Sequence, residues 1–114
     1  NPLAFIFDLE VRDIAEYLKA MFFASDNAEE VIEELKYYLQ IKTLSIYEYH
    51  MLYARLLYPS YYFDLYENIM NNDESEEKLV NIIKKNKEYE LFLKNAYLEI
   101  SKYAPIEKID WLIN

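Results

Sequence analysis

Apolar residues recur at helical spacing along most of the chain. Between residues 8 and 23 they follow i, i+3, i+4 and i+7, which is the pattern of an amphipathic helix with one buried face. That face would consist of Val11, Ile14, Ala15, Leu18, Met21 and Phe22. Residues 28–40 show the same spacing and predict a second helix. Its inward face would consist of Val31, Ile32, Leu35, Tyr38 and Leu39.

The stretch around which we expect the rest to pack is SIYEYHMLYARLLYPSYYFDLYENIM, residues 45–70. It carries much of the chain's tyrosine, and Pro59 divides it in the middle. Proline lacks an N–H and clashes with the preceding turn, so a helix must stop or bend there. We therefore predict a third helix ending at Tyr58 and a fourth running to Asn71. Their apolar faces would consist of Ile46, Tyr49, Leu52, Tyr53, Leu56, Phe63, Tyr66, Ile69 and Met70.

A long fifth helix is predicted over residues 74–103, after the polar loop NNDES. Its buried stripe would consist of Leu79, Ile82, Ile83, Tyr89, Leu93, Ala96, Tyr97 and Ile100. Pro105 ends this helix and opens a short terminal one, residues 106–114. Trp111, the single tryptophan, would dock that terminal helix onto the core.

Three polar sites predict helix starts. Asp8 can accept hydrogen bonds from the free N–H groups at the start of the first helix, and Asn27 lies in the polar break before the second. Ser45 and Glu48 have the spacing of a capping box, in which each side chain accepts a hydrogen bond from the other residue's backbone N–H.

Glycine is absent from all 114 residues. Tight hairpin turns and phosphate-binding loops depend on glycine, so its absence favours helices with short loops over sheets. It also excludes a P-loop or a dinucleotide fingerprint. We therefore predict an all-α fold, a compact bundle of about five to six helices with short loops. On size the chain, residues 1–114, is a single helical domain.

The charge balance and the lack of cysteine exclude further classes of function. A net charge of −9 repels phosphate backbones, so we expect no nucleic-acid partner. The cluster Lys84, Lys85 and Lys87 lies among acidic residues and is interpreted as a solvated helix face. Without cysteine there are no disulfides or thiol nucleophiles, which fits a reducing, cytoplasmic location. No apolar run reaches the ~18 residues that span a bilayer, so we expect no membrane partner.

No catalytic, cofactor-binding or metal site can be assembled from the sequence. His50 is the single histidine, and we interpret it as a packed or surface residue. A di-metal helical bundle needs Glu-x-x-His, but Tyr47 stands three residues before His50. The early glutamates of the second helix, at 29, 30, 33 and 34, are therefore expected to complement the helix dipole.

Two structural hypotheses concern charged and aromatic residues. Arg55 lies beside the apolar stripe and, if partly buried, needs a carboxylate, with Asp64, Asp13 and Glu67 as candidates. The 13 tyrosines are expected mainly to fill the core and cover its rim. The alternative is a binding surface, for which the candidates are Tyr58, Tyr61, Tyr62 and Trp111.

A family resemblance adds to this. The segment IFDLEVRDIAEYLK resembles the stretch after the catalytic centre in kinase-like proteins of the aminoglycoside phosphotransferase and choline kinase type. Asp13-Ile14-Ala15 matches the Asp-Leu-Ala triplet that opens their C-terminal helical subdomain. The likeness is closer to the bacterial spore-coat-associated members. LYARLLYPSYYFDLYE resembles their helix–proline–helix stretch, and IDWLI resembles their closing segment.

The resemblance implies a helical lobe, or fragment, of a larger kinase-like spore-coat protein. It also implies that the catalytic parts lie elsewhere, because the chain has no His-x-Asp-x-x-x-x-Asn loop and no glycine-rich strand. Asp8 stands too close to Asp13 to match the family's metal-binding Asp, and Asp13 would brace the missing catalytic loop. The chain would then be a scaffold or substrate-side wall without activity of its own.

Its partners would be the missing N-terminal lobe, other coat proteins or a second copy. The alternative is a free-standing α-helical module that binds a protein through an aromatic face.

Overall fold

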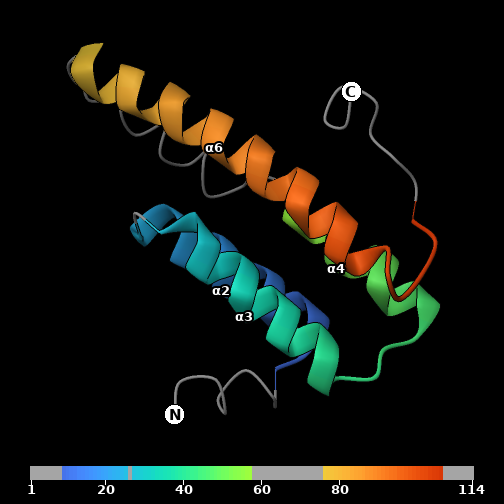
Figure 1. Cartoon of the computed structure of the whole chain (residues 1–114). Coiled ribbons are helices and arrows are strands. Elements are labelled where there is room, and N and C mark those ends of the chain that lie inside the picture. The colour runs from blue at the N-terminus through green and yellow to red at the C-terminus, as the bar shows by residue number, and fades with distance from the viewer. Residues whose placement is uncertain (1–8, 26, 58–75, 107–114) are drawn as a thin grey trace.

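The computed structural model describes residues 9–25, 27–57 and 76–106, and within these ranges it contains four α-helices and no strand. They are α2 (Val11–Ala24), α3 (Ala28–Ile41), α4 (Ile46–Leu57) and α6 (Glu76–Ile100) (Figure 1). In α6, the side chains of residues 76–80, 82 and 83 are not described. The all-α prediction is confirmed. The helix expected over residues 59–71 and, apart from Ile106, the one expected over residues 106–114 fall outside the described ranges, so the predicted five to six compare with four.

The four helices enclose one core. α2 packs most closely against α4 and also lies against α3, while α6 contacts α3 and α4. Figure 1 shows α2 and α3 side by side and antiparallel, with the longer α6 passing them on the side of α4. α4 is the described part of the segment expected to organise the fold, and its close packing on α2 agrees with that expectation.

The predicted apolar faces of α2, α3 and α4 are buried, except that Met21 and Ile32 are half-buried and Ile46 is exposed. Ile46 is 63% exposed, so its predicted burial is wrong. It is the first residue of α4, and that end of the helix lies at the edge of the bundle (Figure 1), where neighbouring helices do not cover it. The buried face of α4 begins one turn later, at Tyr49.

Two of the three predicted caps are confirmed. The Asn27 side chain accepts a hydrogen bond of 3.2 Å from the Glu30 N–H. In the capping box, Oγ of Ser45 accepts from the Glu48 N–H at 3.1 Å, and Oε1 of Glu48 accepts from the Ser45 N–H at 2.9 Å. The first helix differs: it begins at Val11 with Glu10 at the N-cap position and no side-chain cap, while Asp8 lies outside the described residues.

Aromatic rings join α2 to α6 at the centre of the core. The Phe22 ring lies 5.1 Å from that of Tyr89 and 5.3 Å from that of Phe92, measured between centroids. Buried tyrosines also need a partner for the hydroxyl group. Tyr89 donates to the carbonyl of Leu56 at 2.5 Å, and Tyr38 donates to the carbonyl of Leu9 at 2.9 Å. These two tyrosines therefore serve the core, as predicted, whereas Tyr47 and Tyr103 are exposed.

The lysine cluster on α6 is only partly a solvated face. Lys84 and Lys87 are exposed, but Lys85 is not. Its Nζ donates to the carbonyl of Ser25 at 2.8 Å, lies 4.7 Å above the Phe22 ring and approaches Glu88 to 3.7 Å. Ser25 is the C-cap residue of α2. A lysine ammonium group there is stabilised by the negative end of the helix dipole. The prediction was wrong for Lys85 because this contact crosses 60 residues of sequence.

Candidate functional site

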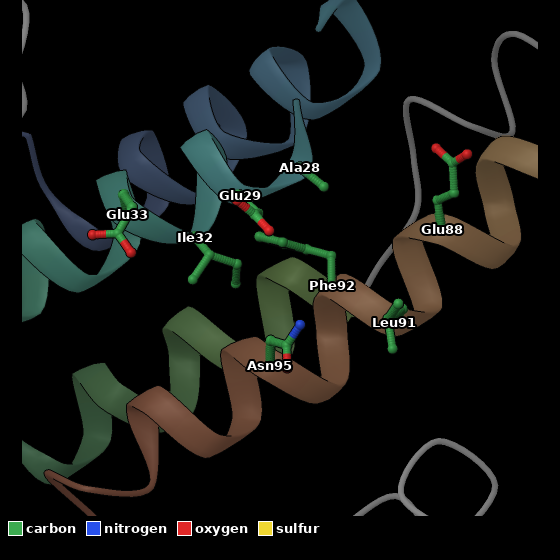
Figure 2. Close-up of a pocket in the computed structure, with 8 residues that line it drawn as sticks. All are labelled: Ala28, Glu29, Ile32, Glu33, Glu88, Leu91, Phe92 and Asn95. Atoms are coloured by element: carbon green, nitrogen blue, oxygen red, sulfur yellow. The ribbon is translucent and has the colours of Figure 1, made fainter. Parts of the chain in front are cut away.

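An open groove lies between α3 and α6, with a volume of ≈ 470 Å³ (Figure 2). Ala28, Glu29, Ile32 and Glu33 line it from α3, and Glu88, Leu91, Phe92 and Asn95 line it from α6. Its size is within the range of about 300–1,000 Å³ that is usual for ligand sites. The groove is therefore a candidate site for contact with another molecule.

The floor of the groove is apolar because the two helices meet there. Figure 2 shows Phe92 reaching from α6 toward α3, on the side where Ile32 lies. Phe92 is buried and belongs to the core, while Ile32 is half-buried against it. Leu91, the neighbour of Phe92 on α6, is 60% exposed. The groove thus continues the core outward into a surface that the four helices leave uncovered.

The rim of the groove is acidic. Glu29 and Glu33 lie one turn apart on α3, and Glu88 lies on α6, all exposed. Lysines outside the lining stand near two of them: Lys36 Nζ lies 3.4 Å from Glu33, and Lys85 Nζ lies 3.7 Å from Glu88. No basic residue lines the groove itself. The site therefore combines apolar contact area with carboxylates that would attract a cationic group.

A stripe of α6 extends the groove along the helix. Glu88, Leu91, Asn95 and Leu98 follow one another at steps of three and four residues, so they lie on one helix face. Leu98 is 56% exposed, nearly as much as Leu91. We call these four residues the α6 stripe. Two exposed leucines seven residues apart on one face are typical of a helix that receives a partner.

Glu34 is a second unusual residue, buried on α3 with 7% of its surface exposed. Its Oε2 has no hydrogen-bond partner in the described part of the chain. Burial raises the pKa of the Glu34 carboxyl, and the charge of Glu30 raises this pKa further. Burial and the charge of Glu34 likewise raise the pKa of Tyr17 on α2. The Glu34 carboxylate is thus packed between α3 and α2, and its incompletely bonded burial lowers the stability of the fold.

We expect Glu34→Gln to raise the free energy of unfolding by about 1 kcal/mol near pH 7, because it removes an incompletely bonded buried charge. A carboxyl whose pKa is raised by folding stabilises the folded state at low pH, and that stabilisation is lost as pH rises through the raised value. The gain should therefore shrink as pH falls from about 7 toward about 4. Urea unfolding at several pH values checks this.

The exposed Glu33→Gln is the matched control and should change stability little at either pH. A Glu34→Gln protein that is less stable than the parent at pH 7, or a gain independent of pH, would contradict the buried-charge explanation.

The predicted site residues are only partly described. His50 is exposed, Asp13 is exposed and Arg55 is half-buried. Asp64 and Glu67, and the proposed surface of Tyr58, Tyr61, Tyr62 and Trp111, lie outside the described residues, so the Arg55 ion pair and the aromatic surface stay predictions.

Among the described residues, no three His, Cys, Asp or Glu side chains gather as a metal site would require. No helix in the described ranges is long and apolar enough to cross a bilayer.

The groove itself was not predicted from the sequence. The sequence pattern assigns Glu29 and Glu33 to the helix dipole and gives Leu91 and Leu98 no place in the buried face of α6. The available signal was this pair of leucines, which share one face of α6 but fall off the face that carries Tyr89, Leu93 and Ala96. The groove forms only because α3 packs against α6 next to Leu91, and this contact between helices cannot be seen in the sequence.

Comparison with known proteins gives two matches. Residues 1–96 match the family described as "Spore coat putative kinase YutH". The chain is also similar to the endospore coat-associated protein YutH of Bacillus subtilis (strain 168), with 31% identity over 121 residues. That alignment covers 97% of the chain and 36% of the relative, so the chain spans much less than the relative's full length. No solved structure matches the chain.

The resemblance to spore-coat-associated proteins noted in the sequence is thus confirmed, whereas the wider kinase-like likeness stays a prediction. The family match extends from the first residue through most of α6 and takes in both walls of the groove. The chain therefore belongs to the spore coat YutH family.

Proposed function

We propose that this chain is a helical domain that joins a spore-coat protein to other proteins and has no catalytic activity of its own. The observation that carries the proposal is the groove between α3 and α6, where exposed Leu91 and half-buried Ile32 continue the core outward. Apolar surface that a fold leaves open and rims with polar groups usually marks contact with another protein.

The comparisons support a role for the chain in the spore coat. The Bacillus subtilis relative is named as endospore coat-associated, which supports contact with other coat proteins. The chain spans 36% of that relative, so other parts of such a protein would carry any phosphotransfer suggested by the family's description. In this proposal the four helices form a scaffold or a wall beside those parts, and the groove is their outward contact.

The alternative, an aromatic binding face, has less support among the described residues. Tyr38, Tyr49, Tyr53 and Tyr89 are all buried, so their rings are committed to the core. Tyr47 on α4 and Tyr103 beyond the end of α6 are exposed, which is fewer rings than the four that are buried. The groove, with its apolar floor and acidic rim, offers a more specific contact than the described tyrosines do.

The test is the location of the chain in a sporulating cell. A fluorescent fusion of the 114 residues, produced in Bacillus subtilis during sporulation, should gather on the forespore surface and remain with the coat fraction after the spores are washed. The fluorescent protein alone is the control and should stay diffuse. A fusion that also stays diffuse would contradict the proposed contact. Binding of ATP and Mg²⁺ by the chain, measured by calorimetry, would contradict the non-catalytic part.

A further inference from the structure

Resting on that proposed function, the geometry points to one class of partner: the α3/α6 groove binds an amphipathic helix of another protein, with apolar residues on one face and lysine or arginine beside them. Two features of the described residues lead to this assignment. They are the α6 stripe with its two exposed leucines and the acidic rim of the groove.

The α6 stripe gives the shape of the occupant. Leu91 and Leu98 are separated by seven residues, which is about 10 Å along a helix axis. Both side chains are more than half exposed, and α3 stands beside the Leu91 end. A compact small molecule would fill the space near Ile32 and Phe92 and leave Leu98 uncovered. A helix of about three turns, laid along α6, would cover both leucines with apolar residues at i, i+3 or i+4, and i+7.

The acidic rim gives the charge of the occupant. Glu29 and Glu33 edge the groove on α3, and Glu88 edges it on α6. A basic side chain leaving the apolar face of a bound helix would meet one of these carboxylates. A second copy of the chain is a poor occupant, because each copy carries a net charge of −9 and would bring carboxylates to carboxylates. The charge therefore favours a basic partner over self-association.

The test uses a synthetic amphipathic peptide of about 16 residues, long enough for roughly four helical turns. It carries leucine at heptad-like positions, lysine beside them and a fluorophore, and binding to the 114-residue chain is followed by anisotropy. Two control peptides are used, one with every lysine replaced by glutamate and one with the same residues scrambled. We expect binding of the first peptide and at least about ten-fold weaker binding of both controls.

Matched variants of the chain locate the binding site. Leu91→Asp and Leu98→Asp should each weaken binding by about ten-fold or more, because they place a charge in the apolar contact. Ile46→Asp changes an equally exposed apolar residue on α4 and should leave the affinity unchanged within about two-fold. Circular dichroism of each variant confirms that the helices remain.

The double variant Glu33→Gln, Glu88→Gln tests the rim. It should weaken binding by about five-fold at low salt and lose most of the dependence on salt between about 50 and 300 mM, because rim charges act mainly through screened attraction. Absence of peptide binding, equal binding of the scrambled or acidic peptide, or equal loss in Ile46→Asp would each overturn the assignment. If the chain still reaches the coat in cells, the proposed function stands and this inference alone fails.

Discussion

Replacing Phe22 with alanine should lower the free energy of unfolding by about 3–5 kcal/mol, enough to unfold much of a domain of this size. The ring is 1% exposed. Its centroid lies within 5.5 Å of the centroids of Phe23, Tyr89 and Phe92, so the substitution empties a space that rings from α2 and α6 share. The substitution also removes the aromatic ring over which Lys85 Nζ lies.

Urea unfolding followed by far-ultraviolet circular dichroism measures this loss. Tyr47→Ala is the control, because it also removes an aromatic ring but from an exposed position on α4, and it should change stability by no more than about 0.5 kcal/mol. A Phe22→Ala protein that loses less than about 1 kcal/mol would mean that the aromatic cluster does not hold α2 to α6.

Leu52→Ala is expected to lower the free energy of unfolding by about 2–5 kcal/mol. Leu52 is fully buried on α4, the helix that packs most closely against α2. Removing its side chain leaves a cavity between helices that are already close, and the backbone can collapse into that cavity only partly. Thermal and urea unfolding both measure the effect.

Leu98→Ala supplies the comparison for Leu52→Ala, since it is the same substitution in an exposed part of α6. We expect a change within about 0.5 kcal/mol. Similar losses for the two substitutions would contradict the assignment of Leu98 to an open surface and of Leu52 to the core. Leu98→Ala also shows whether the α6 stripe can be altered without harm to the fold, which the binding experiments require.

Much of the fold could be predicted because it depends on local sequence. The 3.6-residue period placed the buried faces of α2 and α3, and the spacing of Ser45 and Glu48 predicted a capping box that both side chains form. These features involve residues within one or two turns of a helix, whose proximity follows directly from their spacing in the sequence. The start of α2 was predicted at Asp8, but Glu10 occupies the N-cap position and its side chain makes no capping hydrogen bond.

The features that escaped prediction depend on contacts between distant parts of the chain. Lys85 meets the end of α2 across 60 residues, and no local pattern separates it from its exposed neighbours Lys84 and Lys87. Glu34 follows Glu33 in an acidic run, yet the packing of α3 buries one and exposes the other. The groove has the same origin, because its two walls come from α3 and α6 and neither wall alone differs from an ordinary amphipathic helix.

The central claim is that this chain acts by contact through the α3/α6 groove, and the most direct measurement compares forespore localisation of three fluorescent fusions of equal abundance. The parent chain and Ile46→Asp should gather on the forespore surface, while the double variant Leu91→Asp, Leu98→Asp should stay diffuse although it folds. If the double variant reaches the forespore as well as the parent chain does, the groove is not the contact and the claim is wrong.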